Sequence, residues 1–327
     1  MKKIAVLAIG GTISSRSDDP LSTTNYAPVL SAEELTAELL SYCSAANIEL
    51  FTEDIFKIDS ASLSPRQWLQ MAQRTQELLD GDFDGVVITH GTDTMEESAY
   101  FLNLCVKSDK PVIFTGAMRP ASALSADGPL NLYQAITAAA SDVLRGCGVL
   151  VEMNGVLIAA RDARKIHPTR TDAFTPVEMG KIGSITDGHI ELFYIPAKCH
   201  TINSEFDCCR IKELPEVGVL YAYAGAPEEL LDLCETRNMA GIVIAGVGNG
   251  NISTSWYSRA AELAKKMAVV RCTRANGFVN HNGSQNDDAD GFISGGTLSA
   301  QKARILLMFA MANGYTGKRI QEVFDRY

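Results

Sequence analysis

Two short stretches of this chain contain residues able to do chemistry. Gly10-Gly11-Thr12-Ile13 lies near the start, and His90-Gly91-Thr92-Asp93-Thr94-Met95 lies about eighty residues further on. Each places a threonine hydroxyl on a glycine-containing loop after an apolar run, and the second adds a carboxylate. A hydroxyl is a weak nucleophile that needs an adjacent base. The two stretches predict nucleophilic attack on a carbonyl, without serine, cysteine, metal or cofactor.

The order of elements predicts that these loops meet. Thr12 follows the first predicted strand, Ser60 the second, and Thr92-Asp93 the third. Ligands of open parallel sheets bind beyond the carboxyl ends of the strands. We therefore expect the three loops to converge on one crevice that takes a small-molecule substrate.

Each loop also has a simpler interpretation. Gly10-Gly11 is compatible with a plain turn or a nucleotide loop, but neither GxGxxG nor GxxxxGK[ST] occurs, which disfavours nucleotide binding. Asp93 and Thr94 are ordinary helix-capping residues. We expect Thr94 with Glu97 to supply that cap and to leave Asp93 for a substrate ammonium. His90 is expected to be a hydrogen-bonded structural histidine.

Apolar runs alternate with helical patterns along the chain. Helix starts are predicted at Ser31, Ser64, Thr94 and Ser299. The alternation predicts an α/β fold with mainly parallel sheets and helices on both faces. The predicted strands are Ile4–Ile9, Glu49–Ile58, Gly85–Thr89, Pro111–Thr115, Gly148–Met153, Val217–Tyr223, Gly241–Ala245 and Ala268–Cys272.

The length of 327 residues predicts two domains. The periodic pattern breaks over about twenty residues, which is typical of a linker or a functional loop. We expect a larger N-terminal domain at 1–195, a linker at 196–216 and a smaller C-terminal domain at 217–327.

Composition restricts the partners. The net charge of −10 argues against nucleic acid, and no apolar stretch approaches the roughly 20 residues of a membrane span. Eight scattered cysteines without a CxxC favour a reducing compartment, and the adjacent Cys208 and Cys209 are expected on a surface loop. The predicted location is the cytoplasm; the alternative is a secretory leader that has been removed.

Several motifs together resemble the bacterial-type asparaginase/glutaminase family. Ala8-Ile-Gly-Gly-Thr-Ile-Ser14 is similar to its first signature, and Gly85-Val-Val-Ile-Thr-His-Gly-Thr-Asp-Thr-Met95 to its second. The similarity continues through Gly116–Pro120, Ser125–Tyr133, Gly246–Asn251 and Ser294–Leu298 to the C-terminus, so it covers essentially the whole chain.

The resemblance implies a role for each matching residue. Thr12 corresponds to the nucleophile, and Tyr26 to a tyrosine that closes over it on a flap. Thr92, Asp93 and Lys165 correspond to a second catalytic cluster. The substrate-binding positions are Ser60, which binds the α-carboxylate, Ala61, Gly91, Thr92 and Asp93, with Asn251 and Gln285 contributed by a neighbouring subunit.

The implied reaction is hydrolysis of L-asparagine to L-aspartate and ammonia through a threonine acyl-enzyme. The general base stays open between Tyr26 and the Thr92–Lys165 pair, because Asp93 near Lys165 favours the charged ammonium. The alternatives are a broad glutaminase-asparaginase and, from another class, a non-catalytic amino-acid sensor. The resemblance also implies a homotetramer built as a dimer of dimers.

Three positions depart from the family pattern. Ile9 replaces a small or hydroxyl residue. Ala61 stands where extracytoplasmic members carry a glutamine, and Asp59-Ser60-Ala61-Ser62 is similar to the Asp-Ser-Ser stretch of cytoplasmic members. Gln285 aligns with a glutamate that binds the substrate amino group, unless Asp287 or Asp288 supplies that charge. Ile9 is expected to be a packing change. With Gln285 in place of the glutamate, amino-group recognition rests mainly on Asp93, which predicts a higher KM or tolerance of substrates without a free amino group.

Overall fold

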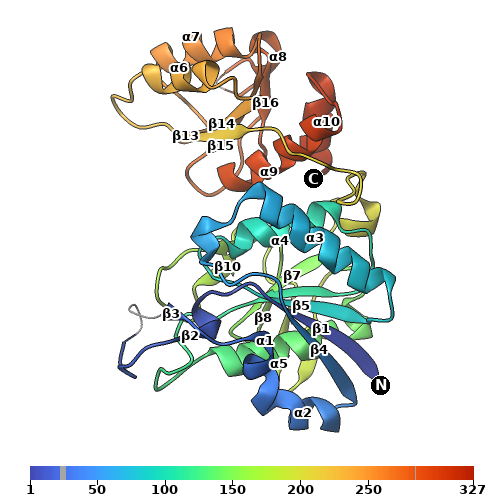
Figure 1. Ribbon diagram of the computed structural model, residues 1–327. Helices are drawn as coiled ribbons and strands as arrows, with labels where there is room; N and C mark the ends of the chain where they lie inside the picture. The colour runs from blue at the N-terminus through green and yellow to red at the C-terminus, as the bar shows by residue number, and fades with distance from the viewer. Residues whose placement is uncertain (23–26, 284) are drawn as a thin grey trace. The chain divides into compact units, whose positions relative to one another are not determined.

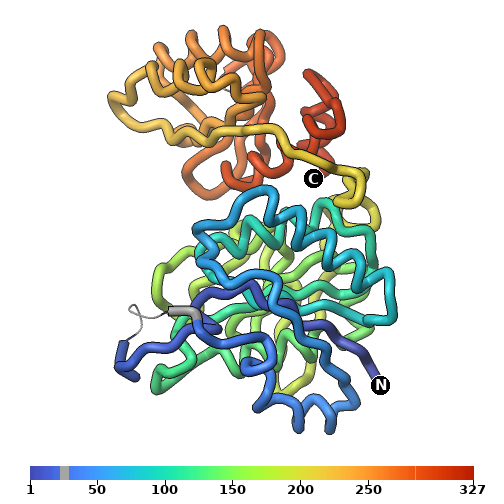
Figure 2. Tube along the Cα trace, viewed as in Figure 1, coloured from blue at the N-terminus to red at the C-terminus, as the bar shows by residue number. Residues whose placement is uncertain are grey.

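The computed structural model describes residues 1–22, 27–283 and 285–327, which form two compact units, Met1–Cys209 and Arg210–Tyr327. Tyr26, the predicted flap residue, lies outside the described residues. The predicted linker 196–216 spans the end of the first unit and the beginning of the second. Each unit has its own sheet, and the trace in Figure 2 follows the chain through both.

The first unit is built on a sheet with the strand order β12-β11-β8-β7-β6-β5-β1-β4 (Figure 1). Strands β4, β1, β5, β6 and β7 are parallel, and β8, β11 and β12 add an antiparallel edge. The strands are β1 (Lys2–Ala8), β4 (Ile48–Asp54), β5 (Gly85–Thr89), β6 (Val112–Thr115), β7 (Val149–Met153), β8 (Val156–Ala159), β11 (Gly183–Thr186) and β12 (His189–Leu192). Two short ribbons lie outside this sheet: β2 (Ser15–Arg16) with β3 (Ala27–Pro28), and β9 (Ala163–Lys165) with β10 (Phe174–Pro176).

Helices cover both faces of this sheet, with α3 and α4 on one face and α1, α2 and α5 on the other (Figure 1). Their bounds are α1 (Ala32–Thr36), α2 (Leu40–Ala45), α3 (Pro65–Asp80), α4 (Met95–Cys105) and α5 (Gly128–Ala139). The capping boxes at Ser31 and Ser64 form as predicted, because each serine side chain accepts a backbone N–H while the third helical residue bonds back.

The second unit has a four-stranded parallel sheet in the order β13-β14-β15-β16. Helices α6 and α7 cover one face and α9 the other (Figure 1). The elements are β13 (Val217–Tyr221), α6 (Glu229–Thr236), β14 (Gly241–Gly246), α7 (Thr254–Leu263), β15 (Ala268–Thr273), α8 (Asp287–Asp290), β16 (Phe292–Ser294), α9 (Ala300–Ala312) and α10 (Lys318–Arg326).

The predicted α/β class with mainly parallel sheets is confirmed, and all eight predicted strands are present. The elements that the sequence pattern missed are short and partly exposed, such as β9 to β12. Among the described residues, none of the helices combines the length and the apolar character needed to cross a membrane.

Candidate active site

The loops that follow β1, β4 and β5 meet where these neighbouring strands end. Thr12 begins a 3-10 turn directly after Gly11, whose φ is +88°. A Cβ added to Gly11 would lie 2.3 Å from Cα of Gly91, and one added to Gly91 would lie 2.7 Å from Oγ of Ser60. Only glycine permits this approach. The three loops therefore converge as the strand order predicted.

The Lys165 side chain, on strand β9, places its ammonium group against the loop that follows β5. Its Nζ lies 2.8 Å from Oγ1 of Thr92 and 2.5 Å from Oδ1 of Asp93. The Lys165 side chain is 14% exposed and that of Asp93 62%. An ammonium has donors only, so the Thr92 oxygen accepts from it. The hydroxyl proton of Thr92 is consequently left for another acceptor, such as a substrate or a water.

Glu96 fixes the backbone of this lysine. Its Oε2 accepts the backbone N–H of Lys165 at 2.6 Å, and it lies buried in the first turn of α4. A charge-assisted bond of this kind restricts the position of the ammonium. The sequence pattern does not single out Glu96, because acidic residues after Thr94 are ordinary signals of a helix start. One signal could have identified Glu96: its position on the face of the helix that points to the core, where an acidic residue is unusual.

The predicted cap by the Thr94 side chain is wrong. Thr94 occupies the N-cap position, but its hydroxyl donates to the Ser60 carbonyl at 2.8 Å and accepts no helix N–H. It therefore ties the loop after β5 to the loop after β4. The physical reason is that these two loops lie closer together than a helix start considered alone suggests.

His90 has a structural environment, in agreement with the expectation. Its Nδ1 lies 2.7 Å from the carbonyl of Gly91, and the ring is fully buried. Burial lowers the pKa of His90 to about 4. The imidazole is therefore neutral at pH 7 and donates to Gly91, which holds the close approach of Gly91 to Gly11 in place.

Ser60 presents a hydroxyl that lacks a partner within the described part of the protein. Its Oγ is buried beside Gly91 and makes no hydrogen bond to any described residue. A buried hydroxyl left unpaired is destabilising, so such a group is suited to bind a ligand. Ala61, the next residue, is exposed and offers no polar side-chain group.

The remaining predicted site residues, Asn251 and Gln285, belong to the second unit. Asn251 exchanges two backbone hydrogen bonds of 2.8 Å with Val247. Gln285 is half-buried, and its Oε1 has no hydrogen-bond partner among the described residues. Asp287 cannot supply charge to a substrate, because it is fully buried against Arg271.

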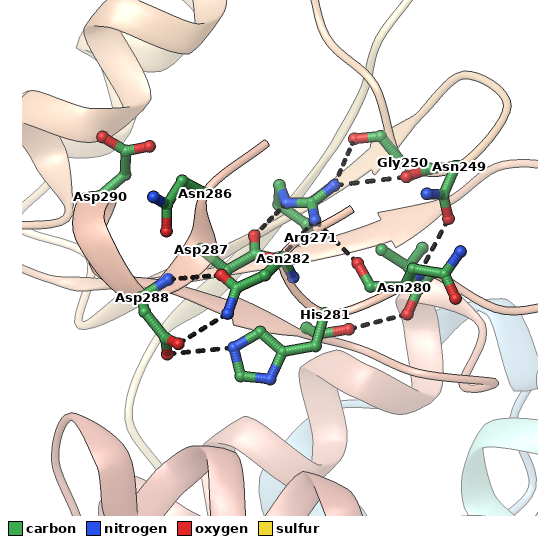
Figure 3. Close-up of polar contacts among 12 residues, drawn as sticks. Asn249, Gly250, Arg271, Asn280, His281, Asn282, Asn286, Asp287, Asp288 and Asp290 are labelled. Carbon is green, nitrogen blue, oxygen red and sulfur yellow. Dashed lines mark hydrogen bonds and ion pairs between the residues drawn. The ribbon is translucent and has the colours of Figure 1, made fainter. Parts of the chain in front are cut away.

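A buried ion pair organises the loops that carry these two residues (Figure 3). Nη2 of Arg271 donates to Oδ2 of Asp287 at 2.7 Å, and Nε donates to Oδ1. Nη1 of the same guanidinium donates to the carbonyl of Gly250 at 3.1 Å, and Asn282 N–H donates to Asp287 at 2.9 Å. The pair thus links the loop before Asn251 to the segment around Gln285.

Two family models match the chain. The asparaginase N-terminal model matches residues 3–198, and the glutaminase/asparaginase C-terminal domain model matches residues 216–324. The chain is 40% identical to the probable periplasmic L-asparaginase of Haemophilus influenzae, over 100% of this chain and 93% of the relative. It is 39% identical to the glutaminase-asparaginase of Pseudomonas fluorescens biotype A, over 100% of this chain and 91% of the relative.

A solved structure is similar along its whole length. The crystal structure of the probable cytoplasmic L-asparaginase of Campylobacter jejuni matches with a TM-score of 0.96 and 39% identity, covering 100% of both chains. Both family models, the relatives and the solved structure thus point to one family over nearly the whole sequence. The chain therefore belongs to the asparaginase family.

Proposed function

We propose that this protein hydrolyses the side-chain amide of L-asparagine to L-aspartate and ammonia. The observation that carries the proposal is the Lys165 ammonium, held between Thr92 and Asp93 beside the Gly11–Gly91 contact. Family membership supports the same reaction, since relatives at 35–40% identity are named L-asparaginase or glutaminase-asparaginase.

In the proposed reaction, the Thr12 hydroxyl attacks the amide carbon, and loop N–H groups stabilise the oxyanion that develops. In this scheme Tyr26 takes up the hydroxyl proton while it passes its own phenolic proton to the amide nitrogen. The C–N bond then breaks, and ammonia leaves with a transferred proton. A water oriented by Thr92 hydrolyses the acyl-enzyme. Lys165 donates to both Thr92 and Asp93, so its role in this scheme is to orient the Thr92 hydroxyl.

Substrate recognition follows from the same groups. Asp93 uses Oδ1 for Lys165, and its second oxygen would bind the substrate ammonium. The Ser60 hydroxyl and the Gly91 backbone would bind the α-carboxylate. Ala61 and Gln285 add no charge to the amino-group site. We therefore propose that this site binds the amino group less tightly than one with a glutamate at position 285.

Glutamine is the second candidate substrate. Relatives at 39% and 36% identity are named glutaminase-asparaginase, and the exposed Ala61 leaves space next to Ser60. A substrate longer by one methylene needs only a small enlargement of a pocket, because one methylene changes binding by about 1–3 kcal/mol.

Assembly and location belong to the proposal as well. Asn251 and Gln285 would complete the site of a neighbouring subunit, so the active species would be a homo-oligomer, a tetramer formed as a dimer of dimers. Residues 1–195 would form the catalytic domain and 217–327 the second domain, in the cytoplasm. Light scattering coupled to size exclusion measures the assembly, and a monomer with full activity contradicts it.

The test of the reaction is the Thr12→Ala variant, assayed for ammonia release from asparagine and glutamine. We expect activity to fall at least about a thousandfold, because the nucleophile is removed. Thr236→Ala, an exposed threonine on α6, is the matched control and should keep full activity. Unchanged turnover in Thr12→Ala would remove this residue from the mechanism.

Amino-group recognition is tested by comparing asparagine with succinamic acid, which lacks the α-amino group. We expect the ratio of kcat/KM for the two substrates to be small in this protein and to increase in Gln285→Glu. Gln321→Glu, a glutamine of α10, is the control substitution. A strict requirement for the amino group in the unmodified protein would contradict the role given to Gln285.

A further inference from the structure

A cluster of three thiols and a carboxylate lies at the end of the first unit, and the proposed reaction does not use it. It consists of Asp207, Cys208 and Cys209, with Cys105 at the end of α4 against them. One carboxylate oxygen and the two sulfurs of the consecutive residues lie within 4.8 Å of one another. Three adjacent side chains seldom converge in this way, because neighbours in an extended chain point to opposite sides.

Hydrogen bonds hold the cluster in this shape. The Cys208 N–H donates to the Cys105 carbonyl at 3.1 Å, and the Cys208 carbonyl accepts from Gln73 at 3.1 Å. Asp207 Oδ1 accepts the N–H of Cys209 at 2.9 Å. Cys208 is thereby fixed between α3 and α4, with a buried sulfur, while Cys209 is exposed. The surface-loop expectation therefore applies to Cys209 and is wrong for Cys208.

These ligand atoms are of the kind that a soft divalent cation binds, and they lie within 4.8 Å of one another. Tetrahedral Zn²⁺ has Zn–S bonds of about 2.3 Å, which puts its ligand atoms about 3.8 Å apart. Thiolates select zinc and related soft metals over Mg²⁺ or Ca²⁺. The Cys105 thiol, which lies against Cys208, donates to the carbonyl of Phe101 within α4 at 3.3 Å.

We propose that Asp207, Cys208 and Cys209 form a zinc-class metal site, in which Cys105 positions the sulfur of Cys208. The exposed Cys209 provides the entry path, and solvent takes the fourth tetrahedral position. The metal has a structural effect. It fixes the turn that contains Asp207, Cys208 and Cys209 at the end of the first unit.

The test is a Co²⁺ titration of the full-length, reduced protein, followed by displacement with Zn²⁺. We expect one Co²⁺ per chain, with thiolate-to-cobalt charge-transfer absorption and the visible bands of a tetrahedral ion. Both signals should disappear in the Cys208→Ser/Cys209→Ser double variant. They should persist in Cys199→Ser, a half-buried cysteine outside the cluster. Cys105→Ser should keep the bands and bind about tenfold more weakly, as loss of an outer-shell partner predicts.

A second measurement guards against misfolding of the variants. Zn²⁺ should raise the midpoint of thermal unfolding of the unmodified protein and of Cys199→Ser, and should leave the midpoint of the double variant unchanged. Asparagine turnover confirms that each variant is folded. Equal Co²⁺ affinity in the unmodified protein and the double variant, or binding without charge-transfer absorption, would overturn the proposal.

Discussion

Two ion pairs of this molecule lie next to residues of the candidate site. They differ in solvent exposure and in how many hydrogen bonds the protein makes to the charged groups. In the first unit, Lys165 pairs with Asp93, whose side chain is 62% exposed. In the second unit, Arg271 pairs with Asp287, and both side chains are 0% exposed. In the first pair, Lys165 Nζ also donates to the hydroxyl of Thr92, a residue of the candidate site.

The buried pair is saturated by hydrogen bonds. Besides its two bonds to Asp287, Arg271 donates to the carbonyls of Asn249, Gly250 and Asn280. Burying two charges is costly unless such partners replace the lost water. In the Lys165–Asp93 pair the carboxylate stays largely in water, so it needs less compensation and keeps one oxygen for a ligand. The difference agrees with the proposed role of the Lys165–Asp93 pair in binding and catalysis, whereas the Arg271–Asp287 pair holds its own loops together.

The largest effect is expected from Lys165→Met. The substitution removes the ammonium that orients Thr92, so kcat/KM for asparagine should fall by about 10²-fold or more, the cost of misplacing a reacting group. The unfolding midpoint in guanidinium should change little, because the pair is partly exposed. Lys212→Met, an exposed lysine of the second unit, is the control. A large loss of stability with retained turnover would reverse the assignment.

The opposite pattern is expected from Arg271→Met. Removal of the guanidinium leaves Asp287 buried without its cation, which should lower the free energy of unfolding by about 3–5 kcal/mol. Guanidinium titration at a fixed protein concentration measures this value. Activity per folded molecule should fall less than in Lys165→Met. A stability change below about 1 kcal/mol would show that the buried pair is dispensable.

A buried carboxyl that pairs with no cation in the described part of the chain sharpens the contrast further. Glu152, on β7, is fully buried, and burial raises the pKa of Glu152 from its ordinary value of 4.5 to about 8. Between these values the folded state keeps the proton and the unfolded state loses it. Stability from this group is therefore present below about pH 4.5 and is lost as the pH rises to about 8.

Glu152→Gln should remove this pH dependence. The variant keeps an acceptor for the Gly155 N–H and a group able to bond Thr115. We expect the variant to gain about 2–4 kcal/mol over the unmodified protein between about pH 5 and pH 8, from urea titrations at both pH values. The buried His90 acts in the opposite direction below its unfolded pKa, but it is present in both proteins and cancels in the difference. Parallel pH profiles would contradict the raised pKa.

The part of the site that depends on strand order can be predicted from the sequence. Continuous apolar runs identify the parallel strands, and the loops after β1, β4 and β5 meet because these strands are neighbours in the sheet. The loop residues Thr12, Ser60 and Thr92 therefore follow from the pattern of strands and loops. Lys165 is identified by the family motif instead, since the short strand β9 has no apolar pattern of its own.

Contacts between distant segments cannot be predicted in the same way. The bond from Thr94 to the Ser60 carbonyl and the bond from the Lys165 backbone to Glu96 join residues far apart in sequence. Threonine and glutamate at a helix start often bond to the nearby helix backbone, but here Thr94 and Glu96 bond to distant segments instead. The pairing of Arg271 with Asp287 likewise depends on packing of the second unit, and nothing in the spacing of the two residues indicates it.

The smallest effect is expected from Arg259→Met, which repeats the Arg271→Met substitution at the surface of the same unit. Arg259, on α7, pairs with Asp232, Glu235 and Glu262, whose carboxylates raise the pKa of Arg259. Exposed pairs contribute about 0–1 kcal/mol, and salt screens them. We expect a loss within that range at low ionic strength and a smaller one in about 0.5 M salt, where the Debye length is a few ångströms. A loss equal to that of Arg271→Met would show that burial does not distinguish these two arginines.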